Sequence, residues 1–114
     1  MQHTKTPRLR SERIHALDRA LRERILVMDG AMGTMIQRHE LSEEDFRGER
    51  FENNPVSLEG ANDLLCLSRP ALIRSIHSEF LLAGADLIET NTFSSNRISL
   101  EDYELSEISE ELNC

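Results

Sequence analysis

The sequence predicts an α/β fold, in which parallel strands alternate with helices. Two short apolar runs support this prediction, residues 25–28 (ILVM) and the first half of residues 85–93 (ADLIETNTF), and each run is followed by polar residues where its strand should end. One amphipathic helical pattern lies between the two runs and another follows the second. This order indicates a βαβ unit with parallel neighbouring strands and a right-handed crossover.

The N-terminal part is predicted to be a polar, disordered lead over residues 1–10, followed by a helix capped by Ser11. Three apolar residues recur at helical spacing in that helix: Ile14, Leu17 and Leu21. Residues 25–28 then form a continuous apolar run, as expected of a strand buried on both faces. We therefore separate residues 1–24, a lead and a helix, from a domain over residues 25–114.

The middle of the chain is predicted to be mostly loop with short helical turns. Residues 33–39 have room for one or two turns. Residues 40–62 are polar and contain two glycines and a proline, so they are expected to form an extended loop with a helical turn at residues 42–46.

Two longer helices are predicted in the second half. The first has Ser68 as its cap, Pro70 in its first turn and Gly84 as its C-terminal stop. One apolar stripe follows this helix: Leu72, Ile73, Ile76, Phe80 and Ala83. The second covers residues 98–112, with an apolar side expected to face inward: Ile98, Leu105, Ile108 and Leu112.

The predicted elements are too few for a complete parallel sheet. Each strand of such a sheet needs cover on both faces and partners at both edges, which two strands do not provide. We therefore expect the 114 residues to be a truncated part of a larger α/β domain.

The composition is typical of a soluble globular protein, with 39% hydrophobic and 30% charged residues. No apolar run is long enough to cross a bilayer, and no secretory signal is recognisable. Two cysteines without an export signal favour free thiols and a cytoplasmic location. The net charge of −8 argues against nucleic acid as a partner. Residues 1–24 are basic, but their helical pattern and acidic residues favour a solvated helix over a nucleic-acid or membrane arm.

Both predicted strands end in residues suited to binding an amino acid. Asp29 and Glu89 follow the strands at the end where α/β proteins bind ligands, and each could anchor an ammonium group. Gly30 and the amides after it could bind a carboxylate, because small residues let a ligand approach N–H donors. The residues thus indicate an amino-acid-sized ligand at the carboxyl ends of the strands.

Structural interpretations of the same residues remain open. Residues 30–33 could be only a tight turn into a helix, with Asp29 as its cap, and their glycines match neither a dinucleotide fingerprint nor a phosphate loop. Glu89 could form a structural ion pair with Arg74 or Arg97. The next three residues could bind local backbone groups in a turn: Thr90, Asn91 and Thr92.

The sequence does not indicate a metal site. His77 is interpreted as a surface or boundary residue of a helix and His39 as a loop residue beside Glu40, so neither is predicted to be a ligand. Cys66 and Cys114 also lack a Cys or His at the spacing of zinc ligands.

Four stretches in fixed order resemble the opening of the cobalamin-dependent methionine synthase family: RILVMDGAMGTMIQ, DFRGERF, NDLLCLSRPALIRSIHSEFLLAGADLIETNTFSSN and DYEL. The resemblance covers about residues 20–113 nearly without gaps. It implies an N-terminal fragment, about two βα units, of a (β/α)8 TIM barrel that binds homocysteine and is shared with betaine– and other homocysteine S-methyltransferases.

The resemblance also implies a chemistry. In that family three cysteines hold zinc, zinc binds the homocysteine thiolate that attacks the methyl group of methylcobalamin, and methyltetrahydrofolate remethylates the cobalamin from another domain. The match implies that Asp29 meets the ammonium group of homocysteine, while the Gly30 and Ala31 amides meet its carboxylate. The residues after the second strand match a wall of the same substrate pocket: Glu89, Thr90, Asn91, Thr92 and Phe93.

The chain departs from the family pattern in three places. Ala31 replaces the commoner second glycine, and Ala61 stands where asparagine is frequent. The zinc-binding cysteines have no match, since Cys66 and Cys114 correspond to neither of their positions. We therefore expect a homocysteine clamp without metal ligands, catalytic residues, a bound cofactor or activity of its own. The alternatives are the start of a cobalamin-independent homocysteine methyltransferase, which would use betaine or S-methylmethionine, and a non-catalytic remnant.

Overall fold

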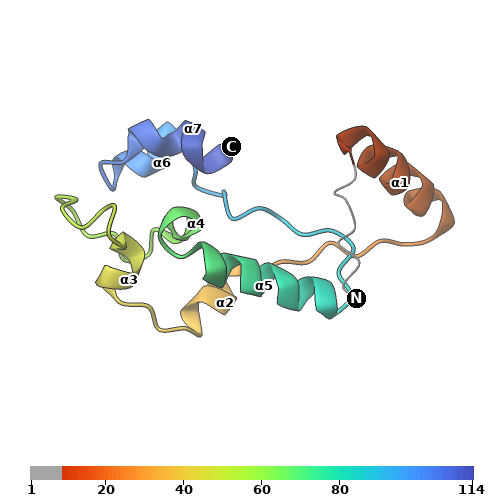
Figure 1. Ribbon diagram of the computed structural model, residues 1–114, viewed down its shortest axis with the longest axis horizontal. Coiled ribbons are helices and arrows are strands. Elements are labelled where there is room, and N and C mark those ends of the chain that lie inside the picture. The colour runs from red at the N-terminus through yellow and green to blue at the C-terminus, as the bar shows by residue number, and fades with distance from the viewer. Residues whose placement is uncertain (1–8) are drawn as a thin grey trace, which may run out of the picture.

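The computed structural model describes residues 9–114, so most of the expected lead over residues 1–10 lies outside the described residues. The described part is mostly helical (Figure 1). In chain order its elements are α1 (Arg10–Glu23), α2 (Met32–Gln37), α3 (Glu43–Arg47), the 3-10 turn η1 (Asn62–Leu64), α4 (Leu65–Ser68), α5 (Pro70–Leu82), α6 (Arg97–Glu101), the 3-10 turn η2 (Ser106–Ile108) and α7 (Ser109–Asn113).

The two segments predicted to be strands lie parallel but form no strand within residues 9–114. Their pairing is a single parallel bridge between Met28 and Leu87. The Asp29 amide donates to the Leu87 carbonyl at 3.1 Å, and the Leu87 amide donates to the Val27 carbonyl at 3.2 Å. The prediction that residues 25–28 are buried on both faces is wrong, because Ile25 is 89% exposed. Within the described residues the pair has no neighbouring strand, and Val27 and Met28 are also exposed, so a regular ladder does not extend along it.

The start of this paired region is fixed by Asp86. The Arg24 guanidinium makes two hydrogen bonds with the Asp86 carboxylate, at 2.6 and 3.0 Å, and the Val27 amide donates to the same carboxylate at 3.0 Å. These contacts lower the pKa of Asp86 to about 2, with the Arg24 hydrogen bond as the largest cause. The ion pair therefore joins the two segments at the end opposite to Asp29.

The N-terminal helix forms as predicted, but its cap and its environment differ from the prediction. The helix starts at Arg10, and the Leu9 amide donates to the Glu12 carboxylate at 3.0 Å, so Ser11 does not cap it. No residue of α1 is buried, and Figure 1 shows the helix apart from the other elements. Its predicted apolar stripe is therefore exposed: Ile14, Leu17 and Leu21.

The helices around the loop agree closely with the sequence. Residues 32–37 form α2 and residues 43–47 form α3, and the Ser42 hydroxyl caps α3 by accepting from the Asp45 amide at 3.3 Å. In α5 the cap prediction is wrong, because Ser68 belongs to α4 and its hydroxyl donates to the Leu64 carbonyl at 3.3 Å. The helix ends before Gly84 as predicted, where φ is +113°.

The C-terminal helix predicted over residues 98–112 is divided into three short pieces. Glu104 has a φ of +57°, which interrupts the helical backbone between α6 and η2. Leu105, Ile108 and Leu112 are buried as predicted, but Ile98 is 84% exposed on α6.

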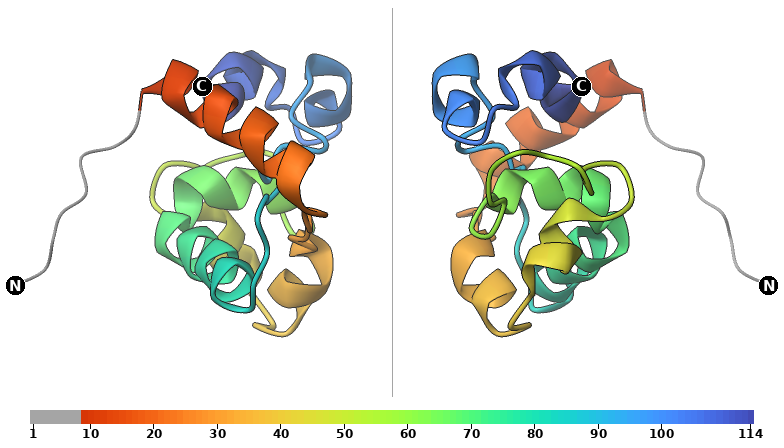
Figure 2. Two further views of the ribbon diagram at one scale, coloured as in Figure 1. Left: turned by 90° about the vertical axis from the view of Figure 1, so that its right-hand side faces the viewer. Right: turned by 90° about the vertical axis from the view of Figure 1, so that its left-hand side faces the viewer.

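One core joins the remaining helices. Figure 2 shows α6 and α7 together on one side of the group formed by α2, α3, α4 and α5. Apolar residues from both groups and from the loop between α3 and η1 are buried: Ile36, Phe46, Phe51, Leu58, Ala61, Leu64, Leu65, Ile73, Ile76, Leu100, Leu105, Ile108 and Leu112. Within residues 9–114, no helix has the length and apolar character needed to cross a membrane.

Candidate functional site

The ends of the two paired segments open onto a pocket of about 720 Å³. Asp29 and Glu89, which follow the first and the second segment, both line it. The other walls are η1 with the two residues before it, and the region around α6 and Tyr103. The lining residues are Met28, Asp29, Gly30, Ala31, Met32, Gly33, Gly60, Ala61, Asn62, Asp63, Glu89, Thr90, Asn91, Phe93, Ser94, Ser99, Leu100, Asp102 and Tyr103.

The turn after the first segment brings backbone and carboxylate together. The Asp29 carboxylate accepts a hydrogen bond from the Gly30 amide at 2.8 Å, so this amide is engaged by the neighbouring side chain. A Cβ atom on Gly30 would lie 3.3 Å from the Glu89 backbone nitrogen, which shows how closely the two segments approach here. Ala31 has a φ of −56°, so its side chain causes no backbone strain in place of the expected glycine.

The second segment contributes residues with different roles. Glu89 and Thr90 are exposed and line the pocket, and within residues 9–114 Glu89 forms no ion pair with Arg74 or Arg97. Thr92 does not line the pocket, but its hydroxyl shares a hydrogen bond of 2.7 Å with that of Thr90.

Asn91 is buried and fixes one wall of the pocket to another. Its amide nitrogen donates to the Asn62 carbonyl at 2.8 Å and lies 3.7 Å from the Cys66 sulfur. The Asn91 carbonyl in turn accepts from the Cys66 thiol at 3.6 Å. Because these contacts occupy its side-chain nitrogen, Asn91 positions the wall rather than offering that donor to a ligand.

The sequence interpretation missed Asp63, a buried carboxylate in the pocket wall. Asp63 belongs to η1, and its carboxylate accepts hydrogen bonds from the Ser94 amide at 2.7 Å and the Ser95 hydroxyl at 2.8 Å. Its position directly before the apolar pair Leu64 and Leu65 was the available signal. Both leucines are fully buried, so the residue before them is drawn toward the core.

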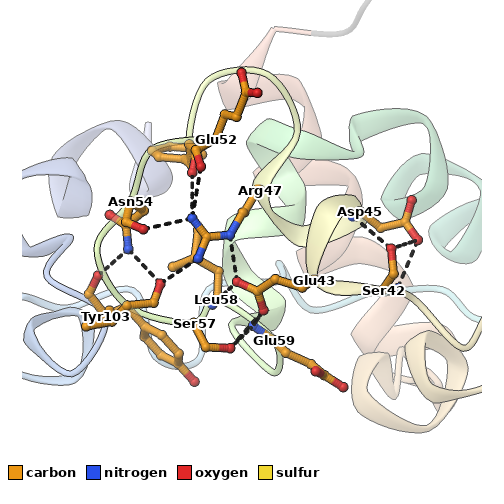
Figure 3. A network of polar contacts seen from close by, with 12 residues as sticks. Ser42, Glu43, Asp45, Arg47, Glu52, Asn54, Ser57, Leu58, Glu59 and Tyr103 are labelled. Atoms are coloured by element: carbon orange, nitrogen blue, oxygen red, sulfur yellow. Dashed lines mark hydrogen bonds and ion pairs between the residues drawn. The ribbon is translucent and has the colours of Figure 1, made fainter.

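A polar network between α3 and the loop that leads to η1 supports this loop (Figure 3). The Arg47 guanidinium donates to four loop carbonyls at 2.8 to 3.3 Å: those of Phe51, Glu52, Asn54 and Val56. The Glu43 carboxylate accepts from Arg47 at 2.8 Å and from the Leu58 amide at 2.7 Å. The Leu58 hydrogen bond is the largest of the causes that lower the pKa of Glu43 to about 2.

The same network reaches the wall around Tyr103. The Asn54 side-chain amide donates to the Tyr103 carbonyl at 3.0 Å (Figure 3). Two adjoining walls of the pocket, Gly60 to Asp63 and the region of Tyr103, are therefore held by a loop whose backbone is bound by α3.

The pocket is negatively charged. Among residues 9–114, four acidic side chains line it and no Lys, Arg or His does. They are Asp29, Asp63, Glu89 and Asp102. Such a lining favours a ligand with a positive group, and an ammonium ion close to exposed carboxylates fits this condition.

The cysteines do not fit a zinc site. Burial raises the pKa of the Cys66 thiol, which disfavours the thiolate that binds metal, and this thiol already donates to Asn91. Cys114 is exposed at the C-terminal end of α7. Within residues 9–114, no three His, Cys, Asp or Glu side chains are grouped so that they could hold a metal ion.

In a comparison with protein families, the family model described as Homocysteine S-methyltransferase matches residues 26–114. The matched region starts in the first paired segment and includes every residue that lines the pocket.

Proposed function

The chain belongs to the homocysteine S-methyltransferase family, and we propose that it supplies the substrate clamp of a cobalamin-dependent methionine synthase. In this reaction a methyl group is transferred to the sulfur of homocysteine, which gives methionine. The observation that supports the proposal most is that Asp29 and Glu89 line one pocket at the end of two parallel segments. This is where parallel α/β folds bind their ligands.

In the proposed clamp the acidic residues bind the ammonium group of homocysteine. Asp29 accepts from Gly30 through one carboxylate oxygen, and the other oxygen is the proposed ammonium acceptor. The Ala31 amide makes no hydrogen bond within residues 9–114 and is the proposed donor to the substrate carboxylate. Thr90 and Glu89 extend the same wall, and Asn91 and Thr92 hold it in place.

We propose further that residues 25–114 form the first two βα units of a (β/α)8 barrel. The parallel hydrogen bonds around Met28 and Leu87 support this arrangement. So does the exposure of large apolar side chains on the paired segments and the helices beside them, because neighbouring strands and helices of a barrel would cover them. The most exposed of these are Ile25, Leu82, Phe93 and Ile98.

Zinc and cobalamin belong to the proposed full-length enzyme rather than to this segment. The environment of Cys66 does not fit a zinc ligand, so we assign no step of metal chemistry to residues 9–114. Their proposed part is to bind homocysteine and orient its sulfur, while methyltetrahydrofolate and cobalamin bind to other domains. The free thiols support a cytoplasmic location.

A second candidate is a cobalamin-independent homocysteine methyltransferase. The four carboxylates that line the pocket favour it, because they would also suit a cationic methyl donor such as betaine or S-methylmethionine. Methyl transfer that requires cobalamin supports the first candidate, and transfer from a sulfonium or quaternary ammonium donor without cobalamin supports the second.

The clamp is tested by Asp29→Asn in a chimera that joins residues 1–114 to the remainder of a related homocysteine domain. Loss of a charge-assisted hydrogen bond of about 1.5–3 kcal/mol should weaken homocysteine binding roughly ten- to a hundredfold. Isothermal titration measures the affinity, and the zinc content should stay unchanged because Asp29 is not a proposed ligand.

The matched control is Asp18→Asn, which removes an exposed carboxylate on α1, where it pairs with Arg22 outside the pocket. This change should leave homocysteine affinity as it is. A folded, zinc-loaded Asp29→Asn chimera that binds homocysteine like the unmodified one would remove Asp29 from the clamp and leave it the role of a turn cap.

A further inference from the structure

We propose that Asp63 is a positioning residue of the pocket, whose carboxylate fixes the wall formed by residues 91–95 against η1. This goes beyond the clamp, because Asp63 acts on the wall and not on the ligand. The proposal rests on the proposed function only for the identity of the ligand, which is homocysteine.

The contacts that define this role come from two neighbouring residues of η1. The Asp63 carboxylate accepts from the Ser94 amide at 2.7 Å and from the Ser95 hydroxyl at 2.8 Å, both through the same oxygen. One residue earlier, the Asn62 carbonyl accepts from the Asn91 side chain at 2.8 Å. The segment is thus bound near both of its ends to a single short turn.

Burial makes these hydrogen bonds specific. Asp63 is 7% exposed, and within residues 9–114 no Lys, Arg or His forms an ion pair with it. A buried carboxylate is costly unless hydrogen bonds replace its water, and here the donors of residues 94 and 95 do so. A loop position that moved either donor away would leave the charge unsatisfied, so the carboxylate selects one position of the wall.

The wall has a second attachment that does not involve Asp63. The Ser95 carbonyl accepts from the Ser109 hydroxyl at 3.1 Å and from the Asn113 side chain at 2.7 Å. Loss of the Asp63 carboxylate should therefore free Ser94, which lines the pocket, while Ser95 stays attached to α7. The expected defect is a displaced wall rather than an unfolded chain.

The first measurement is amide hydrogen exchange by NMR on the chimera that tests Asp29, because its added part covers the exposed apolar residues of the chain. In the unmodified chimera, the Ser94 amide should exchange at least about tenfold more slowly than that of Phe93, which has no acceptor within residues 9–114. Asp63→Ala should remove this difference in exchange rate. Asp63→Asn keeps an acceptor oxygen, so most of the difference should remain in that variant.

The second measurement is homocysteine affinity in the chimera that tests Asp29. Asp63→Ala should weaken binding by about tenfold, and Asp63→Asn should restore it to within about threefold of the unmodified protein. Ser109→Ala is the matched control, because it removes a tether of the same loop that does not line the pocket, and affinity should not change.

The outcomes separate the two proposals. Rapid exchange of the Ser94 amide in the unmodified chimera would overturn the positioning role without any variant, even if Asp63→Ala did not fold. Equal losses of affinity in Asp63→Asn and Asp63→Ala, with Ser94 still protected in Asp63→Asn, would also overturn it, since the charge would then act on the ligand. A protected Ser94 amide together with no homocysteine binding at all would overturn the proposed function and leave the positioning role supported.

Discussion

Gly30 lies where the two paired segments come close together in the pocket, and its φ of +157° disfavours any residue with a Cβ atom. A Cβ atom at this position would lie 3.3 Å from the Glu89 backbone nitrogen and 3.7 Å from the Ile88 Cβ. Gly30→Ala should therefore strain the backbone, push the segments apart and cost roughly 1–3 kcal/mol. Chemical denaturation of the 114-residue chain measures this loss.

Gly33 provides the matched comparison for that substitution. A Cβ atom there would meet nothing within 4 Å, and the residue lies inside α2. Gly33→Ala should be neutral or stabilising by up to about 1 kcal/mol, because alanine favours the helix. If both variants lost the same stability, the close approach at Gly30 would not be the cause of its effect.

At the scale of single residues, sequence reasoning identified the position of the pocket better than the roles within it. The polar residues after each apolar run predicted that Asp29, Glu89 and Thr90 would lie together, and they line one pocket. The sequence could not show that the Asn91 side chain donates to the Asn62 carbonyl, because the two residues are 29 positions apart. Asp63 was missed for a similar reason, since its hydrogen-bond donors lie 31 and 32 residues away in the sequence.

At the scale of elements, Glu43 gives the loop before η1 a pH dependence. Its pKa is about 2 in the fold and 4.5 ordinarily, so the ionised carboxylate stabilises the fold above about pH 4.5. This stabilisation is lost as the pH falls from 4.5 toward 2, because protonation weakens the hydrogen bonds from Leu58 and Arg47. Glu43→Gln should lower Tm at pH 6, and the Tm of this variant should fall less than that of the unmodified chain between pH 4.5 and 2.

Glu44→Gln is the control for this prediction, since Glu44 is an exposed neighbour on α3 whose carboxylate makes no hydrogen bond within residues 9–114. Its Tm should follow that of the unmodified chain at each pH, as measured by circular dichroism. An equal acid sensitivity in Glu43→Gln and the unmodified chain would place the titrating group elsewhere, for example at Asp86, whose pKa is also about 2.

The bounds of a helix could be predicted where residues at its own ends determine them. They could not be predicted where contacts with distant residues determine them. Ser42 and the acidic residues after it determined α3, which the sequence located within one residue. Ser68 was predicted to cap α5 because Pro70 follows it closely, yet Ser68 is the last residue of the preceding helix α4. The break at Glu104 had no local signal, since glutamate favours helices and seldom adopts a positive φ.

At the scale of the whole molecule, the exposed apolar residues predict how the isolated chain behaves. Ile25, Leu82 and Phe93 are each at least 88% exposed, and the paired segments have uncovered edges. The pure chain should therefore bind a hydrophobic dye, associate at high concentration and melt over a broad temperature range. Dye fluorescence, light scattering and calorimetry measure these properties, and a sharp transition of a monomer without dye binding would contradict the proposed barrel unit.

The fold class shows the same division between local and long-range information. The apolar runs correctly predicted two parallel segments with helices between and after them, because neighbouring residues determine that order. The regular strands did not form within residues 9–114, since a parallel ladder is stabilised by neighbours on both sides and cover on both faces.

The way in which Arg47 binds its loop determines which positions are free to diverge. Its contacts to the loop all go to backbone oxygens, which every amino acid provides, so the identity of Glu52 or Val56 does not enter the interaction. Drift at these two sites leaves the interaction intact, whereas replacement of the single arginine removes all four contacts at once. Glu52 and Val56 should thus tolerate substitution, whereas Arg47 should not, although the three residues lie close together in the sequence. Related chains can therefore differ in the side chains that this loop exposes while its backbone conformation stays the same.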